Sequence, residues 1–227
     1  MTGSITTDSP MVIPLRQLLG EDSAPRPAVP HLIDRFGRVA TDLRVSLTDK
    51  CNLRCQYCMP AEGVELMPGT HILTDDEVVR LVRIAVEKLG VREVRFTGGE
   101  PLLRKGLEHI VAETSALRTM DGEPVETSLT TNGLGLVHRA KKLKDAGLTR
   151  VNISMDTAHR ETYAQLTRRD RFDDAVAGAH AAAAAGLLPL KVNTLLIPGI
   201  NDGEACALLV NALVSGFHLR FIEYMPL

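Results

Sequence analysis

Three cysteines within eight residues are the part of this sequence with the clearest chemistry. Cys51, Cys55 and Cys58 follow the spacing Cys-x3-Cys-x2-Cys. Soft thiolates gathered this closely typically bind a metal ion or an iron–sulfur cluster. A closed structural site uses four protein ligands, whereas a catalytic centre leaves one position for a substrate or cofactor. Three ligands therefore indicate an open centre, and on a cubane 4Fe–4S cluster they leave one iron free.

A zinc site is the alternative interpretation, with a distant histidine or Cys206 as the fourth ligand. Cys206 stands alone beside apolar neighbours in a predicted helix over 203–214, where a single cysteine is usually a small core residue. Four cysteines distributed in this way do not form a disulfide framework. Clustered free thiols suit a reducing compartment, so we expect a cytoplasmic protein.

A second motif, Thr97-Gly98-Gly99-Glu100-Pro101, directly follows a strand-like run. Two glycines let the backbone pass close to a ligand and expose N–H groups, and Glu100 can accept hydrogen bonds from an amine. A Gly-Gly turn alone is a weak signal. Placed one strand–helix unit after the cysteines, it predicts a binding site beside the open position of the centre.

Strands and helices alternate from residue 42 onward. Strands are predicted over 43–48, 93–96, 126–131, 150–155, 189–196 and 218–222, and helices over 74–89, 105–117, 134–146, 172–185 and 203–214. This alternation predicts right-handed βαβ units and a parallel sheet. The first strand–helix turn carries cysteines and not Gly-x-Gly-x-x-Gly, so a dinucleotide-binding fold loses its main support.

Local signals mark the ends of two of these helices. Thr74 and Glu77 form a capping box for the first helix, and Gly90 closes it. Asn201, in Asn201-Asp202-Gly203, offers a cap for the last helix. The first helix carries apolar Val78, Leu81, Val82 and Ala85 at helical spacing.

Polar residues collect where the predicted strands end. Examples are Thr48, Thr97, Asn132, Asp156 and Glu223. A barrel of parallel strands keeps its active site at this carboxyl-end rim. We therefore predict an α/β fold, a partial (β/α)6 TIM-like barrel, with the site at its rim.

Composition is that of an ordinary globular protein, with 44% hydrophobic and 24% charged residues among 227. We expect one core domain over 31–227, preceded by a proline-rich flexible arm over 1–30. The net charge of −2 argues against nucleic acid or an acidic membrane as the main partner. No segment approaches the ~20 apolar residues of a transmembrane helix.

The cysteine triplet followed by Gly-Gly-Glu-Pro resembles the radical S-adenosylmethionine (SAM) superfamily. The likeness extends to the GTP 3′,8-cyclase family, molybdenum cofactor biosynthesis protein A. Segments similar to it in order and spacing are 34–38, 42–60, 95–104, 129–133, 150–156, 191–193, 199–202 and 220–225. The resemblance implies a radical lyase that holds a 4Fe–4S cluster and SAM. It would convert GTP to (8S)-3′,8-cyclo-7,8-dihydroguanosine 5′-triphosphate.

The resemblance also implies roles for single residues. Cys51, Cys55 and Cys58 would hold the cluster. The expected SAM-binding residues are Tyr57, Gly99, Ser154 and Met225, and the Gly-Gly-Glu-Pro turn would bind the amino group of SAM. GTP would be bound by Arg44, Arg95, Thr130 and Lys191, with Arg220 as a further basic candidate. A triphosphate needs several cations converging from different strands, which this set provides. An electron donor protein is an expected partner, and a homodimer an expected assembly.

The sequence departs from the family after Leu227. Full-length members continue with a C-terminal region that carries a second cysteine triplet for another 4Fe–4S cluster, and they end in a glycine pair. We therefore expect the SAM half of the site to be complete and the GTP half incomplete, so that this chain alone does not complete the cyclisation. Two alternatives stay open: a peptide-modifying radical enzyme, and a non-catalytic truncated paralogue that still binds a cluster or zinc.

Overall fold

A computed structural model describes residues 29–224 of the chain. The predicted flexible arm falls almost wholly on residues 1–28, and Met225 falls on residues 225–227. Both predictions therefore lie outside the described residues.

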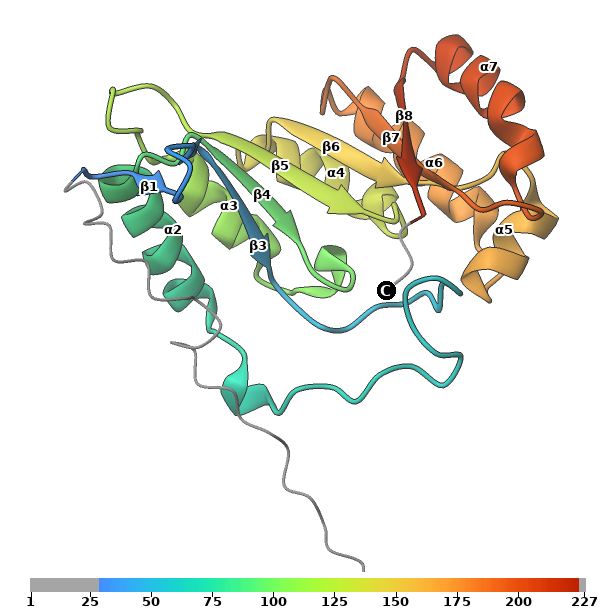
Figure 1. Cartoon of the computed structure of the whole chain (residues 1–227), viewed down its shortest axis with the longest axis horizontal. Helices are drawn as coiled ribbons and strands as arrows, with labels where there is room; N and C mark the ends of the chain where they lie inside the picture. Colours follow the sequence, from blue (N-terminus) through green and yellow to red (C-terminus); the bar gives the residue numbers. More distant parts are fainter. Residues whose placement is uncertain (1–28, 225–227) are drawn as a thin grey trace, which may run out of the picture.

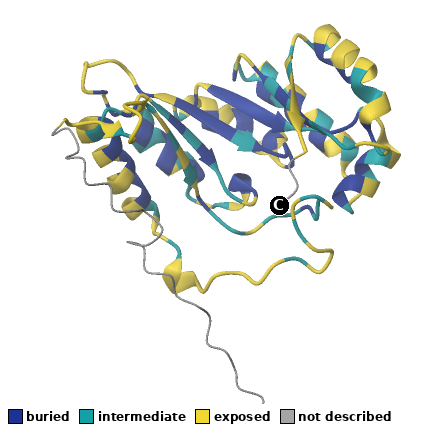
Figure 2. Ribbon diagram, viewed as in Figure 1, coloured by how far each residue is buried: buried dark blue, intermediate teal, exposed yellow. Residues whose placement is uncertain are grey.

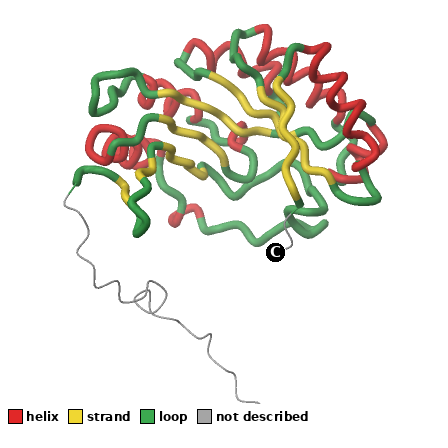
Figure 3. Tube along the Cα trace, turned by 45° about the horizontal axis from the view of Figure 1, so that its top comes forward, coloured by secondary structure: helices red, strands yellow, loops and turns green. Residues whose placement is uncertain are grey.

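Six parallel strands form one sheet in the order in which they occur along the chain (Figures 1 and 3). They are β3 (Asp42–Ser46), β4 (Glu93–Thr97), β5 (Glu126–Thr131), β6 (Arg150–Ser154), β7 (Lys191–Leu196) and β8 (His218–Glu223). Sequential parallel neighbours joined by helical crossovers curve into part of a barrel. The structure confirms the predicted partial (β/α)6 barrel, with β3 and β8 as its two edges.

Helices cover the outer face of this sheet. They are α2 (Asp75–Leu89), α3 (Leu107–Ser115), α4 (Leu136–Asp145), α5 (Arg160–Thr167), α6 (Phe172–Ala184) and α7 (Ala205–Ser215). Short 3-10 turns occur at η1 (Gly69–His71), η2 (Pro101–Leu103) and η3 (Asp202–Glu204), and a small hairpin, β1 (Leu32–Ile33) and β2 (Val39–Ala40), precedes β3. The sequence analysis predicted neither α5 nor this hairpin.

The core fills the space between the sheet and the helices. Phe96, Leu129 and Ile153 from the strands and Val86 and Ile110 from the helices are fully buried. Figure 2 shows the central strands buried, whereas the outward face of α7 is exposed. The carboxyl ends of the strands are thereby held on a packed layer, which fixes the loops that follow them.

Helix α2 confirms the predicted local signals. Thr74 and Glu77 form the capping box, and Gly90 closes the helix in the left-handed conformation at φ 78°. Leu81, one of the four apolar residues at helical spacing, is nevertheless 54% exposed. The buried stripe runs instead through Val78, Val79, Val82, Ala85 and Val86, and Leu81 lies on the flank of that stripe.

The prediction that Asn201-Asp202-Gly203 caps α7 is wrong, because no side chain caps this helix and Asn201 bonds elsewhere. Its side-chain amide donates to the carbonyl oxygens of Asp156 (2.6 Å) and Leu195 (2.8 Å). Its Oδ1 atom accepts from the Ile197 N–H (2.6 Å). An asparagine amide can satisfy donors and acceptors together, so this buried residue joins the chain beyond β6 to the chain beyond β7.

Candidate active site

The cysteine loop lies beyond the carboxyl end of β3, as predicted. Cys51 and Cys55 are half-buried, Cys58 is exposed, and all three are free thiols. The Cys55–Cys58 turn is closed by hydrogen bonds from the N–H groups of Cys58 (3.0 Å) and Met59 (3.1 Å) to the Cys55 carbonyl oxygen. Two of the three thiols therefore belong to one tight turn.

The environment of these thiols argues against a cysteine nucleophile. Burial raises the pKa of Cys55 to about 12, and nearby Asp156 and the other two cysteines add to the shift. Burial also raises the pKa of Cys51. A reactive cysteine needs a lowered pKa. The raised pKa values therefore give no support to a cysteine nucleophile.

The three thiols do not form a preassembled site for a single metal ion. Among residues 29–224 no three His, Cys, Asp or Glu side chains converge as a single metal ion requires. In a cubane cluster each thiolate binds a different iron, so the sulfur atoms need not meet at one point. Cys206, the proposed fourth zinc ligand, is exposed on α7. The donor set thus fits a three-cysteine 4Fe–4S site.

The glycines of the Gly-Gly-Glu-Pro turn are needed for backbone packing against the cysteine loop. A Cβ atom on Gly98 would lie 2.5 Å from the Thr48 carbonyl oxygen, and one on Gly99 would lie 2.4 Å from that of Lys50. The N–H groups of Gly99 and Glu100 donate to these same oxygens, at 2.6 and 2.7 Å.

The expectation that this turn exposes N–H groups to a ligand is therefore wrong for Gly99 and Glu100. Its carbonyls behave differently: those of Gly98 and Gly99 accept no hydrogen bond from residues 29–224. The turn consequently offers acceptors, which suit a ligand ammonium group.

Glu100 is a structural residue and not the exposed acceptor that the sequence suggested. Its side chain is 1% exposed and accepts hydrogen bonds from Thr131 Oγ1 (2.7 Å), the Asn132 N–H (2.8 Å) and the Leu102 N–H (2.9 Å). Asn132 in turn donates to Asn52 Oδ1 of the cysteine loop at 2.7 Å. This chain of bonds ties together the loops after β3, β4 and β5.

Most of the predicted ligand-binding residues meet in one cavity of about 380 Å³ inside the barrel. Its lining includes Arg44, Tyr57, Arg95, Thr130, Ser154 and Arg220. Gly99 and Lys191 do not line it. Lys191 begins β7, and burial together with the nearby guanidinium groups of Arg150 and Arg220 lowers its pKa. The structure therefore brings five predicted residues and Arg220 together and leaves these two outside.

Three arginines line the cavity together with two carboxylates, Asp156 and Glu223, and Asp156 is already bonded to Tyr57. The exposed side chains of Arg44 and Arg220 form no hydrogen bond or ion pair with residues 29–224. Arg95 donates from Nη2 to Glu93 Oε1 at 2.9 Å, and its buried Nε atom has no partner among residues 29–224. A buried donor without an acceptor is costly, so an anionic ligand would complete this site.

Glu93 is a site residue that the sequence analysis missed. Its Oε1 atom accepts hydrogen bonds from Arg95, Arg150 and Ser128. Burial by itself would raise the pKa of Glu93, but the two guanidinium groups lower it overall. Arg150 also contacts Glu126 at 2.6 Å. Glu93 therefore fixes one end of the Arg95 guanidinium at the base of the cavity.

Asp156, which the sequence analysis placed at the rim without giving it a role, links the cysteine loop to the cavity. Its Oδ2 atom accepts a hydrogen bond from the Tyr57 hydroxyl at 2.5 Å, and its Oδ1 atom accepts from the Leu195 N–H at 2.8 Å. Its position directly after Ser154 and Met155, at the end of β6, was the only signal in the sequence. Tyr57 is thereby turned into the cavity.

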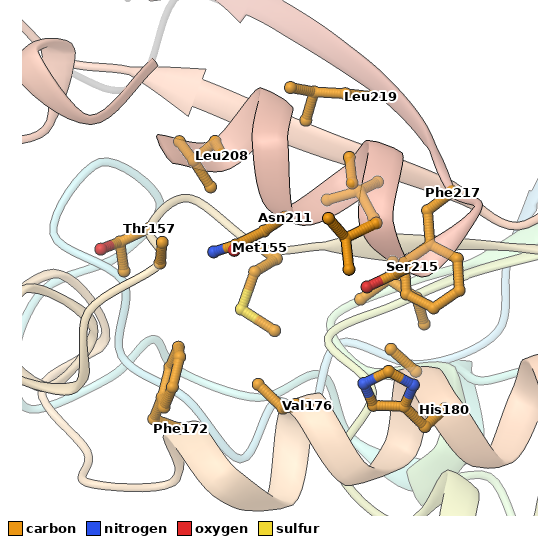
Figure 4. A pocket seen from close by; sticks show the side chains of 16 residues that line it. Met155, Thr157, Phe172, Val176, His180, Leu208, Asn211, Ser215, Phe217 and Leu219 are labelled. Atoms are coloured by element: carbon orange, nitrogen blue, oxygen red, sulfur yellow. The ribbon is translucent and has the colours of Figure 1, made fainter. Parts of the chain in front are cut away.

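A separate cavity of about 390 Å³ lies between α6 and α7 (Figure 4). Apolar side chains such as Met155, Phe172 and Leu219 line most of it. None of the predicted site residues lies there, so this cavity is not part of the candidate active site.

The six parallel strands thus form a partial barrel with three thiols at its rim and three arginines in its interior. The family model described as the radical SAM superfamily matches residues 45–209. The chain belongs to the radical SAM superfamily, whose members use a 4Fe–4S cluster and SAM.

Curated relatives are named GTP 3′,8-cyclase. The chain is 60% identical over 196 residues to the protein of Corynebacterium glutamicum, covering 86% of this chain and 52% of the relative. It is 57% identical over 205 residues to the protein of Streptomyces coelicolor, covering 90% and 59%. The chain thus spans about half the length of the curated relatives that it matches.

Solved structures share the fold at low sequence identity. The structure described as anSMEcpe with bound AdoMet has a TM-score of 0.67 at 20% identity, covering 81% of this chain and 51% of that one. Streptococcus suis SuiB bound to S-adenosylmethionine has a TM-score of 0.64 at 16% identity, covering 82% and 40%. Within residues 29–224 no helix combines the length and apolar character that crossing a membrane requires.

Proposed function

We propose that this chain forms the cluster-, SAM- and nucleotide-binding core of a GTP 3′,8-cyclase of molybdenum cofactor biosynthesis. The observation that carries the proposal is the convergence of Arg44, Arg95 and Arg220 in one cavity that also holds Tyr57 of the cysteine loop. Relatives at 51–60% identity with this enzyme name support the choice of substrate. The product would be (8S)-3′,8-cyclo-7,8-dihydroguanosine 5′-triphosphate.

Cys51, Cys55 and Cys58 would hold the cluster by three of its irons. When bound, the cluster and SAM supply the radical that takes a hydrogen atom from the ribose of GTP. The carbonyls of Gly98 and Gly99 would accept hydrogen bonds from the amino group of SAM. Tyr57 and Ser154 line the adjoining cavity, and Asp156 fixes the Tyr57 ring.

The triphosphate would bind among the cavity arginines. Guanidinium groups bind phosphate oxygens through paired hydrogen bonds, and the unpartnered Nε atom of Arg95 is one such donor. The Thr130 hydroxyl adds a further polar contact in the cavity. Lys191, at the start of β7, would contribute positive charge from outside the cavity lining, near Arg220. Surrounding the nucleotide with barrel strands would also exclude water from the reacting ribose.

Three further predictions belong to the same proposal. An electron donor protein would reduce the cluster, the enzyme would form a homodimer, and it would work in the cytoplasm. A peptide substrate has less support, because a peptide does not require three convergent arginines.

The test begins with anaerobic reconstitution of the chain with iron and sulfide. We expect a brown protein that converts SAM to 5′-deoxyadenosine after reduction and binds GTP in a calorimetric titration. Arg95→Ala should weaken GTP binding by about ten-fold or more, because hydrogen bonds to charged groups contribute ~1.5–3 kcal/mol. Arg92→Ala is the matched control, since Arg92 is exposed and pairs with Asp121 away from the cavity.

The outcomes separate the alternatives. Zinc without iron after anaerobic preparation would identify a non-catalytic paralogue. SAM cleavage without any GTP binding would point to another substrate of a radical enzyme. Equal loss of GTP affinity in the Arg92 and Arg95 variants would show that the cavity is not the nucleotide site.

A further inference from the structure

Helix α5 ends in an unusual way, at Arg168. This residue adopts the left-handed conformation, with φ 54° and ψ 27°, and it is the only non-glycine residue with positive φ in the described part of the chain. Helices α2 and α7 end in the same conformation with Gly90 and Gly216. Glycine is favoured there because it has no Cβ atom to clash. An arginine at this position therefore calls for a reason.

The side chain of Arg168 gives that reason. Its Nη1 atom donates hydrogen bonds to the carbonyl oxygens of Arg54 (3.0 Å) and Met59 (3.1 Å). These two carbonyls flank the Cys55–Cys58 turn on either side. One guanidinium thus bridges both ends of the turn that carries two of the three thiols.

The last residues of α5 hold the same loop through the backbone. The carbonyl oxygens of Leu166 and Thr167 accept hydrogen bonds from the N–H groups of Gln56 (2.9 Å) and Arg54 (3.0 Å). The Gln56 side-chain amide adds a bond to the Gln165 carbonyl oxygen at 2.8 Å. Carbonyls at a helix C-terminus lack partners within the helix, and here the cysteine loop provides them.

Apolar packing between α5 and the cysteine loop adds to these hydrogen bonds. Tyr163 of α5 is 2% exposed and lies in a small apolar cluster with Leu53 of the loop, against which Cys51 and Cys55 pack. Figure 1 shows the segment after β3, in cyan, running below the strand tips to reach α5. The loop is therefore held by a helix more than 100 residues later in the chain.

We propose that Arg168 is a positioning residue for the iron–sulfur cluster, holding the Cys55–Cys58 turn in the geometry that binds it. A guanidinium has several N–H donors on a long side chain, whereas glycine at the same backbone position has none. The inference rests on the assignment of Cys51, Cys55 and Cys58 as cluster ligands.

The test compares Arg168→Gly, Arg168→Lys and the neighbouring control Arg169→Ala in the full chain. Arg169 is exposed and contacts the Arg168 carbonyl oxygen, not the cysteine loop. Arg168→Gly suits the left-handed backbone and removes the whole side chain with its guanidinium. After reconstitution, iron loss to a chelator should be about ten-fold faster, in line with the effect of removing partners that orient metal ligands. The electron paramagnetic resonance signal of the reduced cluster should broaden, because the turn takes several geometries.

Arg168→Lys should fall between Arg168→Gly and the parent chain, and Arg169→Ala should match the parent chain. The melting temperature of the iron-free Arg168→Gly variant should stay within a few degrees of the parent. This result would show that Arg168 orders the Cys55–Cys58 turn and is not required for the stability of the whole fold. Iron loss at the parent rate and an unchanged spectrum in Arg168→Gly would overturn the proposal. Iron retention in Cys55→Ser would instead overturn the ligand assignment itself.

Discussion

The cysteine loop with its supports and the cavity inside the barrel use polar groups in opposite ways. Around the loop, Glu100, Asn132 and Arg168 all have partners within the protein. In the cavity, Arg44 and Arg220 have no polar partner among residues 29–224, and neither has the Nε atom of Arg95. Satisfied buried groups fix one backbone shape, whereas unpaired cations attract an anion. The hydrogen bonds around the cysteine loop therefore hold it in one conformation, whereas the arginines of the cavity can bind an anionic ligand.

This difference predicts two kinds of mutational effect. Substitutions around the loop should change cluster retention or the stability of the fold. Substitutions of the unpaired cavity arginines should change ligand affinity and leave the stability of the fold intact. Four measurements, from the largest expected effect to the smallest, test this contrast.

The largest effect is expected from removing a thiol. Cys55→Ser should abolish cluster binding, so that the iron content after reconstitution falls to near zero, because a hydroxyl is a poor replacement for a soft thiolate ligand. Cys206→Ser is the matched control and should retain full iron content, since Cys206 is exposed on α7. Equal iron content in both variants would place the cluster elsewhere.

The next effect concerns the cavity cations. Replacing both Arg44 and Arg220 by alanine should raise the dissociation constant for GTP about 100-fold, roughly ten-fold for each charged contact. The urea midpoint of unfolding should not change, because neither side chain has a polar partner to lose. A clear loss of stability in this double variant would contradict the contrast between the two regions.

A moderate effect is expected from Glu100→Gln. One carboxylate oxygen becomes an amide NH₂ that faces a donor, so a buried hydrogen bond is lost at a cost of about 2 kcal/mol in the free energy of unfolding. Urea titration measures this cost, with the exposed Glu87 on α2 replaced by glutamine as control. If both variants unfold at the same midpoint, the bonds linking the strand-end loops contribute nothing to stability.

The smallest effect is a pH dependence at the base of the cavity. The pKa of Glu93 is lower in the folded chain than its ordinary value of 4.5. Its contribution is therefore present above that value and is lost as the pH falls through the folded pKa. The stability difference between the parent chain and Glu93→Gln should shrink when the pH is lowered from about 7 to about 3.5. A stability difference that grows on acidification would contradict a lowered pKa of Glu93 in the folded chain. Partial exposure keeps the effect small.

Much of the fold was predictable because its signals are local. Periodicity, the Thr74 capping box and closing glycines depend on residues within a few positions of one another, and the predicted strands agree with β3 to β8 within two residues at each end. The errors arose where distant residues decide. Glu100 was expected to face a ligand, but Thr131 and Asn132 turn it inward. Helix α5 was missed, although it supports the candidate cluster loop.

The sequence by itself determined the alternation of strands and helices, the three-thiol loop and the collection of polar residues at one rim. Only the tertiary structure decided which of those residues share a cavity, which are used up by internal hydrogen bonds, and that Arg168 reaches both ends of the Cys55–Cys58 turn. The physical reason is that spacing within one element follows from its repeat, whereas contacts between residues 54 and 168 depend on how whole elements pack.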